Sequence, residues 1–193
     1  MKKIKLLFVA LLLTGSAAFA QTDMPSSETV LNNAYAQAAK ENKKVLLMFH
    51  ASWCGWCKKM DASLNDPTCK KFFDDNYVVA HLDIMEQAAK KSLENPGAVD
   101  VLTKLTGAKE VGLPYWVILD SKGNTLANSL MGKNGLPSTK LDDNIGCPAT
   151  EQEVTFFDNV LKKTSSLKAE DIAVIHKRFL LNQPPPAPAK GTN

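Results

Sequence analysis

Short apolar runs alternate with amphipathic segments along this chain, and the pattern predicts an α/β fold. Three runs have the length and apolar content of buried strands, at 45–49, 77–83 and 115–119. The stretch 121–124, which contains Ser, Gly and Asn, predicts a turn. The chain is then expected to return over 125–130 and to form a hairpin with the third run.

The remaining segments have helical periodicity, and several begin at residues that cap helices. Ser26 or Ser27 can cap the first helix, and Thr150 with Glu153 forms a capping box before a later one. Asp66 precedes a proline, which disfavours helical geometry and predicts a break between two helices; that proline suits the first position of the second helix. The predicted helices are 27–42, 58–64, 68–74, 85–94, 98–105, 151–163 and 169–180.

The first 20 residues have the pattern of an export signal. Lysines at positions 2, 3 and 5 precede an apolar stretch at 6–13, and the sequence AFA at 18–20 has the small-x-small pattern of a signal-peptidase site. We therefore expect residues 1–20 to be a signal peptide that is removed after Ala20. A retained anchor helix is the alternative.

The rest of the chain suits one domain, 21–182, followed by a proline-rich tail at 183–193 that is predicted to be disordered. The full chain has 23 basic and 20 acidic residues. Removal of the signal leaves the two equal in number, so the charge does not indicate a nucleic-acid partner. No later stretch is long and apolar enough to cross a bilayer. We expect a periplasmic protein with no stable membrane insertion after cleavage.

Two cysteines three positions apart lie where the first predicted strand gives way to a helix. Cys54 and Cys57 flank Gly55 and Trp56, and in an α/β context this spacing indicates a redox dithiol. Unpaired N–H groups and the positive end of the helix dipole stabilise a thiolate at a helix start, which favours Cys54 as the attacking sulfur. Cys57 lies one turn further on the same side, where it can resolve a mixed disulfide.

A zinc site and a purely structural disulfide are weaker interpretations of the cysteine pair. Zinc would need two more ligands, but the chain has no second CxxC or CxxH pair, and its histidines at 50, 81 and 176 are scattered. A structural disulfide across so short a loop would contribute little entropy. We therefore expect no metal and no cofactor, because the electrons reside in the dithiol.

The sequence WCGWCKKM at 53–60, after an apolar strand, resembles the active-site motif of the thioredoxin family, especially of its secreted bacterial members. VGLPYWVILD at 111–120 is similar to the family's segment in which a cis-proline opens a strand facing the dithiol. The resemblance covers 28–163 and implies a thioredoxin-like α/β fold with a mixed central sheet flanked by helices. Segment 169–180 would add an extra C-terminal helix. The family's first strand is expected to be missing or rudimentary, because few mature residues precede the first helix.

The resemblance also implies a substrate-binding surface around the cysteines. Pro114 is expected to be cis and to place the main chain of Leu113 beside the sulfurs, where it can pair with an extended substrate. Gly55 and Trp56 lie between the cysteines, and Trp56 is expected to be exposed and to contact partners. Trp53 is a further candidate for substrate contact, with packing beside the helix start as its favoured role.

Three features depart from the family pattern. Met48 stands where the family has a buried acid that assists proton transfer at the second cysteine, and a thioether cannot take that role. His81 replaces a lysine of the neighbouring strand and is a candidate proton relay for Cys57, with a satisfied strand histidine as the alternative. The Gly-Trp dipeptide is neither the Gly-Pro of reducing thioredoxins nor the Pro-His of strong oxidants, which favours a reductase or mild isomerase.

Two further features allow more than one interpretation. Cys69 and Cys147 are candidates for a structural disulfide, with two buried free thiols as the alternative. The long segment 131–146 is interpreted as a tolerated insertion, since surface loops accept extra length at small cost. A role at the rim of the active site is the alternative.

Together these observations predict a secreted thiol–disulfide oxidoreductase that acts on disulfides or thiols of protein substrates. A redox partner, expected to be membrane-bound, would reload the dithiol. Two other classes stay open. One is a binding module or chaperone of the same fold without redox turnover, and the other is a copper or zinc carrier that uses Cys54 and Cys57 with a histidine.

Overall fold

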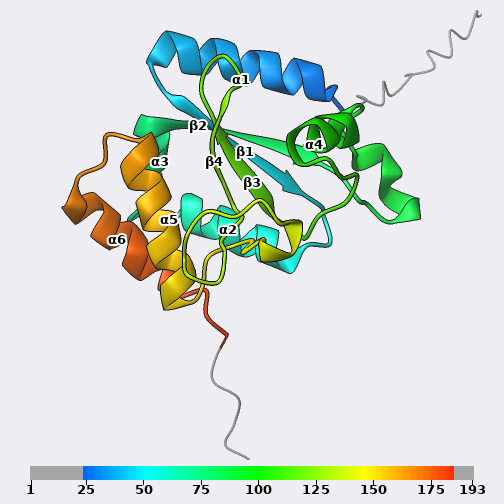
Figure 1. Ribbon diagram of the computed structural model, residues 1–193. Helices are drawn as coiled ribbons and strands as arrows, with labels where there is room; N and C mark the ends of the chain where they lie inside the picture. Colours follow the sequence, from blue (N-terminus) through cyan, green and yellow to red (C-terminus); the bar gives the residue numbers. More distant parts are fainter. Residues whose placement is uncertain (1–23, 185–193) are drawn as a thin grey trace, which may run out of the picture.

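The computed structural model of the protein describes residues 24–184, so the predicted signal peptide and residues 185–193 of the predicted tail lie outside the described part. Figure 1 shows one central sheet with helices on both faces. The strands are β1 Lys44–His50, β2 Tyr77–Asp83, β3 Tyr115–Leu119 and β4 Thr125–Asn128. The α-helices are α1 Ser27–Glu41, α2 Gly55–Leu64, α3 Lys70–Asn76, α4 Ala98–Thr106, α5 Glu151–Thr164 and α6 Ala169–Leu180. Two 3₁₀ segments are η1 Ala88–Leu93 and η2 Leu141–Asp143.

The sheet is mixed, as expected. Its order is β2-β1-β3-β4, with β1 parallel to β2 and antiparallel to β3, and with β3 antiparallel to β4. Within the described residues the chain enters α1 with no strand before it, which leaves β2 at one edge of the sheet. The register places Met48 between His81 on β2 and Trp116 on β3.

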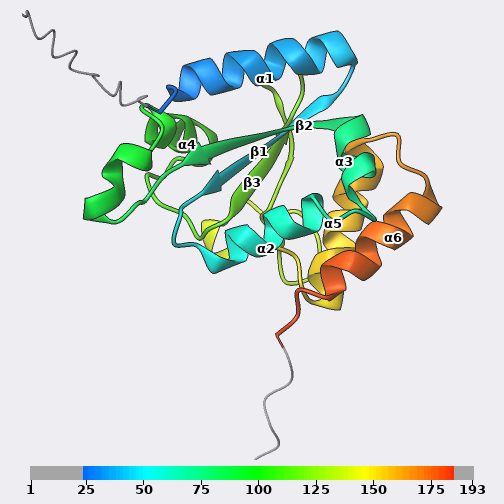
Figure 2. The same cartoon turned by 180° about the vertical axis from the view of Figure 1, so that it is seen from behind.

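The central strand β1 separates two hydrophobic layers. Alternate side chains of a strand point to opposite faces, so Val45 and Phe49 pack with α1 and α4, while Leu46 and Met48 pack with α2, α3, α5 and α6. Figure 2 shows the same division from behind. Because both faces of β1 are covered, its apolar run is continuous rather than alternating. This layering fixes the end of β1, from which the cysteine motif begins.

Several predicted helix starts are confirmed. The Ser26 hydroxyl caps α1 by accepting the Thr29 N–H. Thr150 and Glu153 form the expected capping box at the start of α5, in which each side chain bonds to the other residue's main-chain N–H. Capping satisfies amide groups that a helix start otherwise leaves without partners.

Two predicted helices differ from the structure. The helix after Pro67 begins only at Lys70, because the Asp66 carboxylate accepts the N–H and the hydroxyl of Thr68, at 2.9 and 2.6 Å, and closes a local turn there. The segment 85–94 forms only the short η1, whose first residue is Ala88. The Glu94 carboxylate accepts the N–H of the buried Glu86 at 2.7 Å, so the first residues are held in a turn.

The C-terminal helices complete the core instead of lying beside it. Trp116, Phe157 and Phe179 are fully buried, and the ring of Phe157 lies 5.3 Å from that of Trp116 and 5.0 Å from that of Phe179. The ring of Phe73 of α3 stacks on that of Phe157 at 6.4 Å and lies 6.2 Å from that of Phe179. The predicted extra helix 169–180 is confirmed as α6, which encloses the layer that contains α2.

Candidate active site

The two cysteines of the motif form a disulfide at the start of α2. Cys54 and Cys57 are bonded, with their Cα atoms 5.3 Å apart, and both are buried. Cys54 is the N-cap residue of α2, and its Sγ accepts the N–H of Cys57 at 3.1 Å. The helix start therefore donates a hydrogen bond directly to the sulfur that is predicted to attack, which favours its thiolate once the pair is reduced.

A buried carboxylate anchors the loop that precedes Cys54. The side chain of Glu86 accepts the N–H of Ser52 and, at 2.9 Å, its hydroxyl. Glu86 is only 4% exposed. On the same segment the main-chain oxygen of Met85 accepts the indole N–H of Trp53 at 2.8 Å. The segment after β2 thus holds the active-site loop, a role that the sequence does not reveal because the pattern of 85–94 also fits a regular helix.

Both tryptophans beside the cysteines are exposed. Trp56 is 40% exposed, as expected, and the Nζ of Lys59 lies 4.2 Å from the centre of its ring, a cation–π contact. Trp53 is 48% exposed, so about half of it is covered, and its indole N–H is bonded; its packing role and its contact with substrates both stay predictions. Lys59 also donates to the main-chain oxygen of Asn182 at 2.9 Å, which connects Trp56 to the end of α6.

The second predicted motif faces the disulfide. The Leu113–Pro114 peptide is cis, as the resemblance implied, and the Leu113 side chain packs against Cys54 and Cys57. A cavity of about 300 Å³ opens beside this contact. Its lining includes Trp56, Gly112, Leu113, Asn144, Cys147 and Pro184. The structure thus brings the predicted binding residues Trp56 and Leu113 to one cavity, and Leu113 also packs against the cysteine cluster.

The segment 131–146, interpreted as a tolerated insertion, contributes directly to this site through its last residues. Asn144 donates to the main-chain oxygens of Gly112 and Pro114, at 2.6 and 3.2 Å. Gly146 has a positive φ of 60°, and a Cβ there would lie 3.4 Å from Pro114. The contact with the rim of the active site, which was the alternative interpretation, is therefore present.

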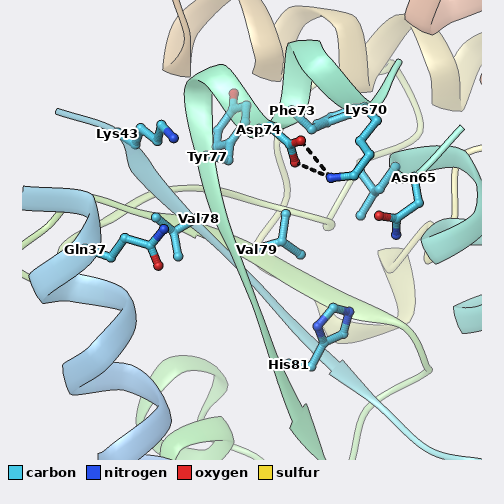
Figure 3. A pocket seen from close by; sticks show the side chains of 11 residues that line it. Gln37, Lys43, Asn65, Lys70, Phe73, Asp74, Tyr77, Val78, Val79 and His81 are labelled. Atoms are coloured by element: carbon cyan, nitrogen blue, oxygen red, sulfur yellow. Dashed lines mark hydrogen bonds and ion pairs between the residues drawn. The ribbon is translucent and has the colours of Figure 1, made fainter. Parts of the chain in front are cut away.

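His81 is bonded to an acid on α2. Its Nε2 lies 2.9 Å from Oδ1 of Asp61, which is one helical turn beyond Cys57, and its ring centre lies 4.8 Å from that of His50. Figure 3 shows His81 at one end of a cavity of about 490 Å³ along β2, with the Lys70–Asp74 ion pair at the other end. A relay role for His81 stays a prediction.

His50, whose ring lies near that of His81, is the last residue of β1 and precedes the active-site loop. Its Nε2 lies 3.4 Å from Oδ1 of Asp83. Burial lowers the pKa of His50, but the Asp83 carboxylate, with smaller contributions from Asp61 and Glu86, outweighs this effect, so the pKa is raised. Met48, which replaces the family's acid, is fully buried on the same face of the sheet.

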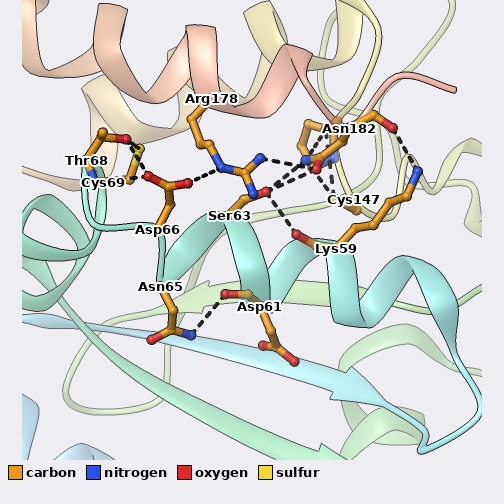
Figure 4. A network of polar contacts seen from close by, with 11 residues as sticks. Lys59, Asp61, Ser63, Asn65, Asp66, Thr68, Cys69, Cys147, Arg178 and Asn182 are labelled. Atoms are coloured by element: carbon orange, nitrogen blue, oxygen red, sulfur yellow. Dashed lines mark hydrogen bonds and ion pairs between the residues drawn. The ribbon is translucent and has the colours of Figure 1, made fainter. Parts of the chain in front are cut away.

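The structural disulfide considered for Cys69 and Cys147 is not formed, and both are buried free thiols. Figure 4 shows Cys69 and Cys147 at opposite ends of a network of polar contacts that includes Arg178. Arg178 donates to the Asp66 carboxylate at 2.6 Å and to Asn182 Oδ1 at 3.4 Å, and Asn182 in turn donates to Cys147 Sγ at 3.4 Å.

Burial disfavours the ionised form of these two thiols. It raises the pKa of Cys147 to about 12, and it raises the pKa of Cys69 above its ordinary value. Because the thiolate is the reactive form of cysteine, neither sulfur is expected to compete with Cys54 at neutral pH.

Residues 24–184 lack a cluster of metal ligands and a membrane-spanning helix. No three side chains of His, Cys, Asp or Glu in this part of the chain are grouped so that they would hold a metal ion. None of its helices combines the length and apolar content that a membrane crossing requires.

The fold and the site define a thioredoxin-like protein with a CxxC disulfide. Residues 27–121 match the sequence profile of a family described as Thioredoxin-like, which confirms the resemblance over this part of the chain. The match includes both motifs, the cysteine pair and the segment around Pro114.

Among curated proteins, a protein disulfide-isomerase of Hordeum vulgare is 31% identical over 77 residues, which is 40% of this chain and only 14% of that relative. Among solved structures, a disulphide isomerase from Xylella fastidiosa Temecula1 is 20% identical, with a TM-score of 0.43, and the match covers 83% of this chain and 98% of that one. The C-terminal domain of Neisseria meningitidis DsbD in the oxidised form is 24% identical, with a TM-score of 0.35, over 54% of this chain and 84% of that one.

Proposed function

We propose that this protein is a periplasmic thiol–disulfide oxidoreductase that reduces or isomerises disulfides of protein substrates. The observation that carries the proposal is the Cys54–Cys57 disulfide at the N-terminus of α2, with Leu113 packed against the cluster that contains it. A helix start lowers the pKa of a thiol, and a second thiol within bonding distance allows the mixed disulfide to be resolved.

The reaction uses two electrons of the reduced dithiol. The Cys54 thiolate attacks one sulfur of the substrate disulfide, so that a Cys54–substrate bond forms and the other substrate sulfur leaves as a thiolate, which takes a proton from water. Cys57, after losing its proton, attacks Sγ of Cys54 and releases the second substrate thiolate. The substrate is reduced by two electrons, and the protein ends with the Cys54–Cys57 disulfide of the structure.

The exposed surface around the disulfide suits a polypeptide substrate. Trp53 and Trp56 present large rings to solvent, and a cavity lies between Trp56 and Leu113. An extended segment beside the substrate disulfide would pair with the main chain of Leu113 and place its apolar side chains against these rings.

Location and partners follow from the proposed signal peptide at 1–20. Export would place the protein where disulfides form and persist, and continued turnover there needs a donor or acceptor that reloads the dithiol. The names of the compared proteins, a disulfide isomerase and a domain of DsbD, agree with such a redox chain. We propose a membrane-bound protein as this partner.

Turnover of a disulfide-bonded protein tests the proposal. The wild-type protein is expected to accelerate the reduction of insulin by dithiothreitol, and Cys54→Ser is expected to return the rate to the uncatalysed one. A binding module without redox turnover predicts no acceleration by the wild type and equal behaviour of the variant. Wild-type rates from Cys54→Ser would rule out the mechanism.

The reduction potential of the pair decides the direction of the chemistry. It is measured with Cys69→Ala and Cys147→Ala in place, so that only one pair titrates. A potential near about −270 mV supports a reductase, whereas one near about −120 mV would mean a disulfide donor and would contradict the preference for reduction.

A further inference from the structure

Three neighbouring residues, Gly112, Leu113 and Pro114, form a short main-chain strip, and Leu113 in its middle packs against the cluster of Ala51, Cys54 and Cys57. Leu113 contacts the cysteines and lines the cavity, so the position of its peptide groups decides how a substrate can pair with it. The carbonyl groups of Gly112 and Pro114 both accept hydrogen bonds from the side chain of Asn144. Asn144 is 32 residues from Gly112 and 30 residues from Pro114 in sequence.

The Asn144 amide uses both of its ends. Its Nδ2 donates to the oxygen of Gly112 at 2.6 Å and to the oxygen of Pro114 at 3.2 Å, and its Oδ1 accepts the N–H of Gly146 at 3.2 Å. A carboxamide combines two donor hydrogens with an acceptor oxygen on one short stem, and a carboxylate of the same shape has no donor. The contact is close, because a Cβ on Gly112 would lie 3.3 Å from Nδ2.

The loop that carries Asn144 is itself fixed to the sheet. The N–H of Ile145 donates to the oxygen of Ser129 at 3.0 Å, and the indole N–H of the buried Trp116 donates to the oxygen of Gly146 at 2.8 Å. Asn144 is therefore held by β3 and by the residues after β4, and it transmits that position to the strip opposite the disulfide.

We propose that Asn144 is a positioning residue for the protein substrate. By engaging the carbonyls on both sides of Leu113, it orients the Leu113 peptide groups toward the cavity beside Trp56, where an extended substrate segment pairs. It does not touch the sulfurs. Its effect should therefore fall on binding of a polypeptide and not on the chemistry of the dithiol. This inference rests on the proposed function.

The test compares a substrate that needs docking with one that does not. Insulin provides a disulfide within a polypeptide, and 5,5′-dithiobis(2-nitrobenzoate) is a small disulfide with no main chain to pair. For Asn144→Ala we expect the KM for insulin to rise about tenfold, the size expected when one or two hydrogen bonds are lost. The kcat for insulin and the rate with the small disulfide should stay within about twofold of the wild-type values. The reduction potential of Cys54–Cys57 should equal that of the wild type within experimental error.

Two variants control for shape and for general loss of stability. Asn144→Asp keeps the acceptor for Gly146 but has no donor for the two carbonyls, so it should raise the KM at least as much as the alanine variant. Asn124→Ala removes an amide that donates to Asp120 at 2.8 Å in the turn at the far end of β3, and it should leave the KM unchanged.

The outcomes separate this inference from the proposed function. Wild-type protein that reduces neither disulfide would refute the function itself. If the wild-type protein reduces both disulfides but the KM for insulin is unchanged in Asn144→Ala or Asn144→Asp, the inference alone is overturned. It is also overturned if a variant loses activity equally with insulin and with the small disulfide. If Asn144→Ala does not fold, Gly112→Ala, whose methyl group crowds Nδ2, is predicted to give the same selective rise in KM.

Discussion

Truncation of Phe179 tests whether the C-terminal helix is part of the domain that carries the site. Phe179 is fully buried, with its ring 5.0 Å from that of Phe157 and 6.2 Å from that of Phe73. Replacing a buried phenylalanine by alanine removes its transfer free energy and leaves a cavity, at a cost of about 3–5 kcal/mol. For a domain of this length, that corresponds to a fall in Tm of about 10 °C.

Urea unfolding of oxidised Phe179→Ala, followed by far-ultraviolet circular dichroism, measures this loss. The control is Leu181→Ala, just beyond the end of α6, where the side chain is 77% exposed and the expected change is below about 0.5 kcal/mol. A loss below about 1 kcal/mol in Phe179→Ala would refute the reasoning, because α6 would then not be packed as described. That result would also remove the basis for the hydrogen bond from Lys59 to the main-chain oxygen of Asn182, just beyond α6.

Two further predictions concern the polar groups near the site. The pKa of His50 is raised by Asp83, so its stabilising charge is present below the ordinary value of about 6.5 and is lost as the pH rises through the raised value. The unfolding free energy of the wild type should therefore exceed that of His50→Gln by more at pH 5.5 than at pH 8.5, and a difference independent of pH would count against this ion pair. Glu86→Gln should lower the unfolding free energy by about 1–3 kcal/mol, because a charged acceptor of two bonds from Ser52 is lost. The exposed Glu110→Gln is its control, and equal stability of the two variants would contradict the anchoring role.

The sequence predicted the parts of the site that lie within one short stretch of chain. The apolar run of β1, the cysteine spacing and the cap-like position of Cys54 are local patterns, and each has a direct physical reason to form. Pro114 could be predicted because the two motifs occur in a recognisable order. The structure confirms the positions of these residues, including the cis peptide and the contact of Leu113 with the cysteines.

Residues that act across long sequence separations could not be predicted in this way. Asn144 contacts Gly112 across 32 positions, and nothing in the loop distinguishes its amide from that of any surface asparagine. Glu86 reaches Ser52 across 34 positions, from a segment whose polar spacing also fits a helix. The pairing of Cys69 and Cys147 was open for the same reason, since composition gives only a count, and the fold shows that both are free and buried.

Trapping of the mixed disulfide tests the central claim that Cys54 attacks and Cys57 resolves. Reduced Cys57→Ser is incubated with oxidised insulin, quenched with acid and separated without reductant, with reduced Cys54→Ser as the matched variant. The account predicts that Cys57→Ser forms a covalent adduct with insulin through Cys54, which dithiothreitol reduces. It predicts little or no adduct with Cys54→Ser. An adduct formed by Cys54→Ser but not by Cys57→Ser, or by neither variant while the wild type turns over, would contradict it.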